Sequence, residues 1–215
     1  MSLLVTEIFR SIQGESTHAG WPCVFVRLTG CNLRCRWCDT SYAYDGGSEM
    51  SADEVLRRIN ALDAPAPGLI EFTGGEPLLQ PEAVDLVNRL AASGRRVLVE
   101  TNGSLDISVL APGVVAIVDM KGPSSDQSGR MDLANLDRLR EGDEVKFVIA
   151  HRGDYAHMLE LLPRIDTKRN VVNASPLFGE LPPAELADWI LEDGLFLRLN
   201  LQQHKHIWPP ETRGV

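Results

Sequence analysis

Three of the four cysteines in this chain lie within eight residues of one another, with the spacing CxxxCxxC. They are Cys31, Cys35 and Cys38, and a loop can turn three thiolates inward together only if it wraps around a metal centre. Iron–sulfur clusters ordinarily use four cysteines, so three leave one iron of a [4Fe–4S] cube open for chemistry. Zinc is the alternative, although a closed structural zinc site normally has four protein ligands. Cys23 stands apart in an apolar run and is expected to be a buried core residue.

Further polar groups follow apolar runs. The stretch 73–77 reads Thr-Gly-Gly-Glu-Pro, and its glycines allow backbone groups to approach a ligand closely. Thr40 follows Asp39, and a hydroxyl beside a carboxylate suits Mg²⁺, although the same pair is also common as a helix cap. Lys121 ends another apolar run, where it either faces solvent or directs its charge into a site.

Both ends of the chain carry groups that could bind a small molecule. Gln13 and Glu15 flank a glycine, and this amide and carboxylate would suit the edge of a purine- or pterin-like heterocycle; a simple polar turn is the alternative. Arg27 lies inside an apolar strand and therefore requires an anionic partner. His204 lies in a His- and Lys-rich run, 202–210, that is either a solvated tail or a segment anchored at the site.

The elements that must position these groups alternate between strands and helices. Short apolar runs bounded by turn residues predict strands at 5–9, 23–29, 69–73, 96–100, 114–119, 144–149, 171–175 and 195–200. Helical spacing and capping signals predict helices that begin after Ser51 and at Pro81, and others at 133–139, 155–162 and 183–192. The segments 65–68 and 122–129 are expected to be loops.

This alternation indicates an α/β fold with a mostly parallel sheet. A complete (β/α)₈ barrel needs about 250 residues, so 215 residues favour an abridged, partial barrel. We expect one domain, 1–215, in which the segments of about 1–20 and 200–215 contribute to the site. The polar stretches directly follow strands, and we therefore expect them to meet at the carboxyl edge of the sheet.

Composition excludes several classes of protein. The chain has 21 Lys and Arg against 30 Asp and Glu, a net charge of −9, which disfavours non-specific binding to nucleic acid or anionic membranes. No signal peptide is visible, and no apolar run approaches the ~20 residues of a membrane helix. The expectation is a cytoplasmic protein with a small-molecule substrate and with neither nucleic acid nor membrane as partner.

The cysteine motif followed by Gly-Gly-Glu-Pro resembles the radical S-adenosylmethionine (SAM) superfamily. Four stretches narrow the resemblance to the 7-carboxy-7-deazaguanine synthases, the QueE family: 8–15, 30–40, 72–77 and the His-Lys pair at 204–205. This resemblance spans nearly the whole chain.

The resemblance implies a lyase that converts 6-carboxy-5,6,7,8-tetrahydropterin to 7-carboxy-7-deazaguanine with loss of ammonia. This radical ring contraction belongs to the biosynthesis of queuosine and other 7-deazapurines. The implied cofactors are a [4Fe–4S] cluster, SAM that is regenerated in each cycle, and Mg²⁺. The family also implies a homodimer and an external electron donor such as flavodoxin or ferredoxin.

The resemblance further implies roles for individual residues. Cys31, Cys35 and Cys38 would hold the cluster, and Thr40 would bind Mg²⁺. The residues implied to bind SAM are Trp37, Cys38, Asp39, Gly75, Glu76, Asp119, Lys121 and Ser175. Those implied to bind substrate are Ile12, Gln13, Gly14, Glu15, Arg27, Thr73 and His204.

The chain departs from the family pattern in two places. It continues through 211–215, where some members end and use their terminal carboxylate on the substrate. It also carries Asp119 and Met120 where some members have serine and proline. Two other readings stay open from the sequence: an activase of a glycyl-radical enzyme and a zinc-binding interaction module.

Overall fold

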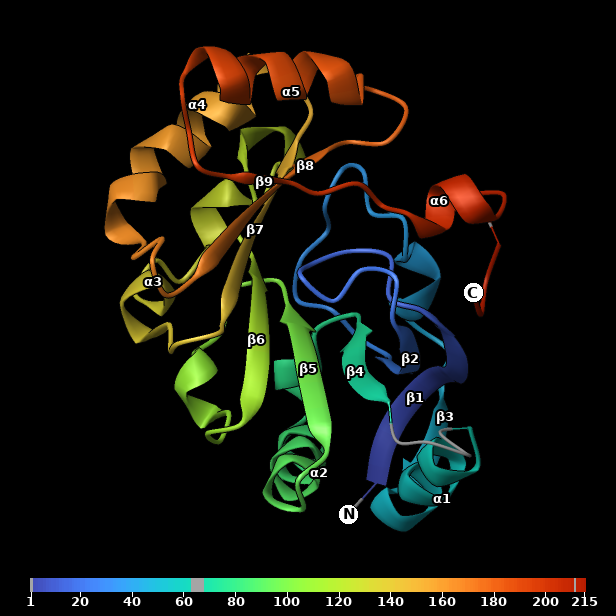
Figure 1. Ribbon diagram of the computed structural model, residues 1–215. Helices are drawn as coiled ribbons and strands as arrows, with labels where there is room; N and C mark the ends of the chain where they lie inside the picture. The colour runs from blue at the N-terminus through green and yellow to red at the C-terminus, as the bar shows by residue number, and fades with distance from the viewer. Residues whose placement is uncertain (1, 63–67, 211) are drawn as a thin grey trace.

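Nine strands form one sheet in the order β3-β1-β2-β4-β5-β6-β7-β8-β9, seen in the computed structural model of Figure 1, which describes residues 2–62, 68–210 and 212–215. From β2 to β9 neighbouring strands are parallel, whereas β1 pairs antiparallel with both β2 and β3. The strands are β1 (Ser2–Ile12), β2 (Pro22–Leu28), β3 (Ser48–Ser51), β4 (Leu69–Gly74), β5 (Arg96–Thr101), β6 (Val114–Asp119), β7 (Glu144–Ile149), β8 (Val171–Pro176) and β9 (Arg198–Leu199). The sheet is curved but not closed, which confirms the abridged barrel.

The longer helices lie on the outer face of this sheet, whereas the short C-terminal helix lies beside the segment that follows β1 (Figure 1). Acidic residues in the first turn of α1 and prolines at the starts of α2 and α5 favour these helix N-termini. The helices are α1 (Ala52–Leu62), α2 (Pro81–Ala92), α3 (Asn135–Arg138), α4 (Arg152–Leu161), α5 (Pro183–Glu192) and α6 (His204–Ile207).

Some boundaries differ from those expected. The strand expected at 195–200 is reduced to Arg198–Leu199, and the helix expected at 155–162 begins at Arg152 because His151 caps it. The helix expected at 133–139 covers only Asn135–Arg138. Within the loop expected at 122–129 lies a 3₁₀ turn, and a second begins there and ends at Arg130. Most of the loop expected at 65–68 lies outside the described residues.

The two faces of each strand have different compositions. Residues that face the helices are apolar and form the main core, which includes Val26, Phe72, Val99, Val118 and Phe147. The alternate residues face the inside of the barrel, because successive side chains of a strand point to opposite faces. At the start of β2, β4, β5 and β6 these inward residues are apolar and include Cys23, which is 1% exposed. Cys23 is therefore a core residue, as expected.

The opening between the two edges of the barrel is occupied by two segments that are distant in sequence. Figure 1 shows the segment after β1 lying between β2 and the β8–β9 edge. There the Ser16 amide donates to Asn200 Oδ1 at 2.9 Å, and the Gln203 amide donates to the Gly14 carbonyl at 2.9 Å. The C-terminal run is thus anchored against the segment 13–21, and both lie beside the inner face of the sheet.

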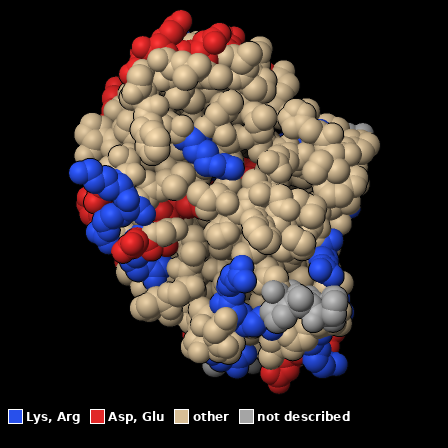
Figure 2. Space-filling view, in the orientation of Figure 1, with Lys and Arg blue, Asp and Glu red and all other residues tan. Residues whose placement is uncertain are grey.

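Charge is unevenly distributed over the surface. Figure 2 shows Asp and Glu side chains gathered at the top, over the end of the molecule that carries α5, whose sequence includes Glu185, Asp188 and Glu192. In the ranges that the structure describes, every helix is too short or too polar to cross a membrane.

Candidate functional site

The three clustered cysteines lie on the loop that follows β2. All three thiols are free and partly exposed. Burial raises the pKa of Cys35 to about 11; the Lys121 ammonium opposes this shift, and the thiols of Cys38 and Cys31 add to it. The loop is held against the next strand ends, because Asn102 Nδ2 donates to Cys31 Sγ at 3.6 Å.

The donor set on this loop, three free thiols, is of the kind that holds iron–sulfur clusters. Among the described residues, no three His, Cys, Asp or Glu side chains are placed to share one ion. In a [4Fe–4S] cube each cysteine binds a different iron, so the thiols need only surround a common volume. The loop supplies three free thiols for this purpose, and the Lys121 ammonium lies close enough to influence Cys35.

The Gly-Gly-Glu-Pro turn packs directly against the cysteine loop. The amide of Gly75 donates to the Leu28 carbonyl at 3.0 Å, and the amide of Glu76 donates to the Gly30 carbonyl at 2.8 Å. A Cβ on Gly75 would lie 1.7 Å from the Gly30 oxygen, so only glycine allows this approach. The turn and the cysteine loop are therefore fixed relative to each other.

Glu76 is fully buried, and its carboxylate accepts hydrogen bonds from three groups of the protein. It accepts from the Leu78 amide at 3.0 Å, from Thr101 Oγ1 at 2.8 Å and from the Asn102 amide at 2.7 Å. Burial raises the pKa of Glu76, and these donors oppose the shift. In this structure Glu76 therefore holds the turn against the end of β5; its contact with SAM stays a prediction.

A second group expected to bind SAM lies at the end of β6, beside Trp37 of the cysteine loop. Lys121 Nζ donates to Asp119 Oδ2 at 2.7 Å and lies 5.0 Å from the centre of the Trp37 ring. Trp37 Nε1 donates to Ser124 Oγ at 3.2 Å. Asp119 and Lys121 are almost fully buried, with side chains 8% and 11% exposed, so Lys121 faces the site and not solvent.

Asp39 and Thr40 place two hard oxygen ligands side by side. Thr40 Oγ1 donates to Asp39 Oδ1 at 2.9 Å, and Lys205 Nζ lies 2.6 Å from Asp39 Oδ2. Partial loss of hydration raises the pKa of the half-exposed Asp39, but the Lys205 ammonium and the Thr40 hydroxyl outweigh it and bring the pKa well below its ordinary value. Two protein oxygens suit Mg²⁺, which usually keeps several waters and takes the rest of its ligands from substrate.

Gln13, Gly14 and Glu15 turn into the barrel directly after Ile12, the last residue of β1. The Gln13 amide group donates to Glu71, and its oxygen accepts from the Glu15 amide at 2.6 Å. Gly14 touches the C-terminal helix, since a Cβ there would lie 2.4 Å from His204 Nδ1. The structure thus brings both terminal segments to one place.

Arg27 also faces the barrel interior, but it has a protein partner. Its Nε lies 2.7 Å from Glu7 Oε1, the cross-strand neighbour in β1. Tyr42 donates to the same oxygen at 2.9 Å, and its ring lies 5.8 Å from the Arg27 guanidinium carbon. A carboxylate ligand would therefore compete with Glu7 for Arg27.

The sequence interpretation missed two charged residues at the centre of the barrel, Glu71 on β4 and Lys146 on β7. It placed Glu100 of β5 among the polar groups at strand ends but gave it no role. Each of the three occupies an inward position of an otherwise apolar strand, the same signal that singled out Arg27. Lys146 Nζ donates to Glu100 and lies 3.1 Å from Glu15 Oε2. Burial, with the Glu100 carboxylate, raises the pKa of Glu71 well above its ordinary value.

The remaining predicted residues line the same interior. Thr73 Oγ1 donates to Glu100 Oε2 at 3.4 Å, and Ser175 Oγ accepts from Asn200 Nδ2 at 2.9 Å. Polar groups from β2, β4, β5, β6, β7 and β8 therefore surround one volume, and the cysteine loop lies at the carboxyl ends of these strands.

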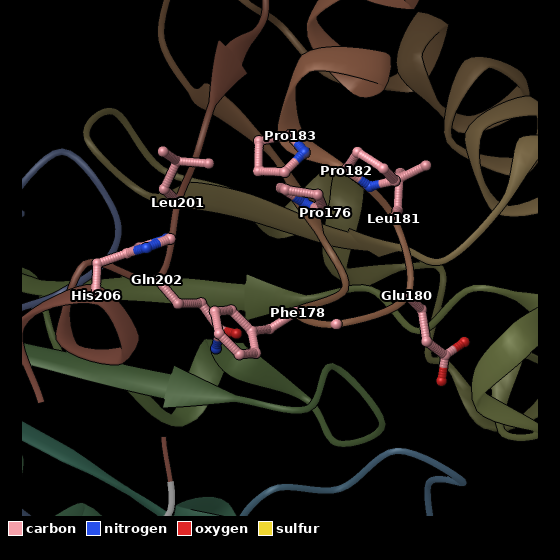
Figure 3. A pocket seen from close by; sticks show the side chains of 10 residues that line it. Pro176, Phe178, Glu180, Leu181, Pro182, Pro183, Leu201, Gln202 and His206 are labelled. Carbon is pink, nitrogen blue, oxygen red and sulfur yellow. The ribbon is translucent and has the colours of Figure 1, made fainter. Parts of the chain in front are cut away.

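A separate hollow of about 280 Å³ adjoins the end of β8. Figure 3 shows Leu201, Gln202 and His206 of the tail on one side and Phe178 and three prolines on the other. Its lining is mostly apolar and includes none of the cysteines and none of the charged residues of the barrel interior. The chemistry expected here therefore lies in the barrel interior and not in this hollow.

Comparisons with known proteins agree with this geometry. Residues 25–165 match the radical SAM superfamily. The chain is 47% identical to a 7-carboxy-7-deazaguanine synthase of Koribacter versatilis, over 98% of this chain and 99% of that protein. It is 44% identical to the synthase of Chlorobaculum tepidum, over 99% and 97% of the two chains.

Solved structures show the same fold at lower identity. The crystal structure of QueE from Escherichia coli superimposes with a TM-score of 0.72 and 22% identity, over 95% of each chain. Streptococcus suis SuiB bound to its precursor peptide SuiA gives a TM-score of 0.57 and 14% identity, over 78% of this chain and 45% of SuiB.

Proposed function

We propose that this chain, a member of the 7-carboxy-7-deazaguanine synthases, catalyses the radical ring contraction of 6-carboxy-5,6,7,8-tetrahydropterin. These synthases belong to the radical SAM superfamily, whose model the chain matches. The product is 7-carboxy-7-deazaguanine, and ammonia is released. The observation that carries this proposal is the polar barrel interior, which meets the cysteine loop at the carboxyl ends of the strands.

Three cysteines would hold the [4Fe–4S] cluster: Cys31, Cys35 and Cys38. When bound, the cluster and SAM supply the 5′-deoxyadenosyl radical that removes a hydrogen atom from the substrate. The chain would position SAM with the Gly-Gly-Glu-Pro turn and with Asp119 and Lys121, all of which lie beside the cysteine loop. Trp37, Asp39 and Ser175 complete the proposed SAM contacts.

Substrate would lie deeper in the barrel, between Arg27, Thr73 and the segment that contains Gln13 and Glu15. A pterin presents adjacent N–H donors, which an ionised carboxylate accepts. Its carboxylate matches the Arg27 guanidinium, and Thr40 would hold a Mg²⁺ ion, which would supply positive charge close to that carboxylate. His204 would close this side, because it packs on Gly14.

The single domain of residues 1–215 would act in the cytoplasm as a homodimer. An external flavodoxin or ferredoxin would supply the electron. Both terminal segments, about 1–20 and 200–215, would contribute to the substrate site, in line with the hydrogen bonds between Gly14 and Gln203 and between Ser16 and Asn200.

The test is turnover by the anaerobically reconstituted protein. Iron and sulfide are measured first, and the reduced enzyme is then incubated with SAM, Mg²⁺ and 6-carboxytetrahydropterin. We expect 7-carboxy-7-deazaguanine and ammonia in equal amounts. Cys31→Ala should abolish iron binding and turnover, whereas the matched Cys23→Ala should retain both. A fully loaded enzyme that makes no deazapurine would overturn the proposal.

A further inference from the structure

One buried lysine, Lys146, contacts carboxylates from several elements of the barrel interior. Lys146 lies on β7, its side chain is 7% exposed, and its ammonium faces carboxylates from three different elements. Its Nζ lies 3.1 Å from Glu15 Oε2 in the segment after β1 and 3.5 Å from Asp119 Oδ2 on β6, and it donates to Glu100 on β5.

The three carboxylates depend on Lys146 to different degrees. Asp119 has a closer cation, because Lys121 Nζ lies 2.7 Å from Asp119 Oδ2. Among the described residues, the hydrogen-bond donors to Glu15 besides Lys146 include the amides of Gln202 at 2.9 Å and Asn200 at 3.4 Å, and Glu100 accepts from the Thr73 hydroxyl. Lys146 is therefore the principal cation for Glu15 and Glu100.

The pKa values of Glu15, Glu100 and Lys146 also reflect their interaction with one another. Burial raises the pKa of Glu15, but the Lys146 ammonium outweighs it and the pKa is lowered. Burial raises the pKa of Glu100, and Lys146 opposes the rise. Burial lowers the pKa of Lys146, yet Glu100, Glu15 and Asp119 together bring it well above its ordinary value. Other charged groups close to this cluster are Asp39, Glu71, Lys121 and His204.

Fold stability alone does not require a lysine at this position. A buried ion pair is often no more stabilising than well-packed apolar residues, because both charges lose their hydration. The next inward residue of the same strand, Val148, is apolar. A charge at Lys146 is therefore better explained by a need to keep the neighbouring carboxylates ionised.

We propose that Lys146 is a positioning residue, whose ammonium holds the Glu15 and Glu100 side chains in place as anions, ready to accept the N–H donors of the substrate ring. This inference rests on the proposed function, since it assigns the pterin-like ring to the space beside these carboxylates. An ionised carboxylate only accepts hydrogen bonds, whereas a protonated one presents a competing donor. Lys146 would thus prepare the cavity before substrate arrives.

The test uses 6-carboxypterin, a fluorescent and unreactive relative of the substrate, and measures its binding to the protein without SAM between pH 5.5 and 9. Lys146→Met removes the cation, so the acidic limb of the binding profile should move up by about 1–3 pH units. Binding near pH 6.5 should fall by at least tenfold. Lys146→Arg should restore most of it, and Lys168→Met, which removes an exposed lysine, should bind as the wild type does.

A second measurement separates charge from folding. Without Lys146 the folded-state carboxyl pKa values lie above their unfolded values, so the stability deficit of Lys146→Met should grow as the pH rises from 5 to 8 in urea unfolding. Adding Glu100→Gln should recover much of this deficit. A deficit that is independent of pH, or pterin binding by Lys146→Met at wild-type strength across the range, would overturn the inference. Wild-type protein that binds 6-carboxypterin but forms no product would instead contradict the proposed function alone.

Discussion

Replacing Gly75 with alanine tests whether the Gly-Gly-Glu-Pro turn and the cysteine loop form one rigid unit. The new Cβ would lie 1.7 Å from the Gly30 oxygen and 3.1 Å from the Cys31 amide nitrogen. Real Cβ atoms essentially never approach within 3.0 Å, so the backbone at Gly30 would have to move by about 1.3 Å. Because the obstacle is backbone, no side chain can rotate to make room.

The magnitude follows from the contacts that this movement breaks. Two backbone hydrogen bonds tie the turn to the loop, from the amides of Gly75 and Glu76, each with a net value of about 0.5–1.5 kcal/mol. Overpacking adds about 1–3 kcal/mol. Gly75→Ala should therefore cost about 2–6 kcal/mol, a large share of the ~5–15 kcal/mol that stabilises a typical domain.

Urea unfolding measures this cost, and iron content after anaerobic reconstitution measures the displacement of Cys31. Gly129→Ala is the matched control, because a Cβ at Gly129 meets no atom within 4 Å, and its stability should stay within about 0.5 kcal/mol of wild type. If Gly75→Ala resembled this control in stability and iron content, the turn would not be packed on the loop, and the reasoning would fail.

Three further predictions concern the surroundings of the cluster. Cys23→Ala should lose about 1 kcal/mol in urea unfolding, because it leaves a small gap in the core, and should keep all its iron; loss of iron would contradict a purely structural Cys23. Thr40→Ala should weaken the response of turnover to added Mg²⁺, and an unchanged titration would remove Thr40 from the metal site. Lys205→Met should cost about 0.2–1 kcal/mol at pH 7, since Asp39 is half-exposed. The folded pKa of Asp39 is lowered, so this difference should shrink as the pH falls below the ordinary value of 3.8; a difference that grows in acid would contradict the pairing.

Local patterns in the sequence predicted most of the fold. The strands Val114–Asp119 and Glu144–Ile149 and the helix Pro183–Glu192 have the boundaries that their apolar runs and capping signals indicated. The sequence did not predict β3, because Ser48–Ser51 is a polar strand that exists through its antiparallel pairing with β1. The expected strand at 195–200 shortened because only Arg198 and Leu199 find partners, on β8.

The candidate site also has parts that local sequence patterns predicted and parts that they did not. The cysteine motif and the Gly-Gly-Glu-Pro turn are short continuous stretches, so the sequence could single them out, and the family resemblance supplied their roles. Glu71, Glu100 and Lys146 meet only because strands β4, β5, β6 and β7 align in register, and no local pattern shows that alignment. The protein partner of Arg27 was likewise hidden, since Glu7 reaches it by cross-strand pairing.

The joining of the two terminal segments has a consequence for the order in which the protein is made. Ser16 and Asn200 are separated by 184 positions, and the Gly14 carbonyl is bound by the Gln203 amide. During synthesis the cysteine loop and strands β2 to β8 leave the ribosome before Asn200 and Gln203, which bind the segment after β1. A nascent chain could therefore form much of the sheet and bind its cluster early. The contacts that hold the segment 13–21 in place would form only after residues 200–203 have emerged, so this part of the barrel is ordered last.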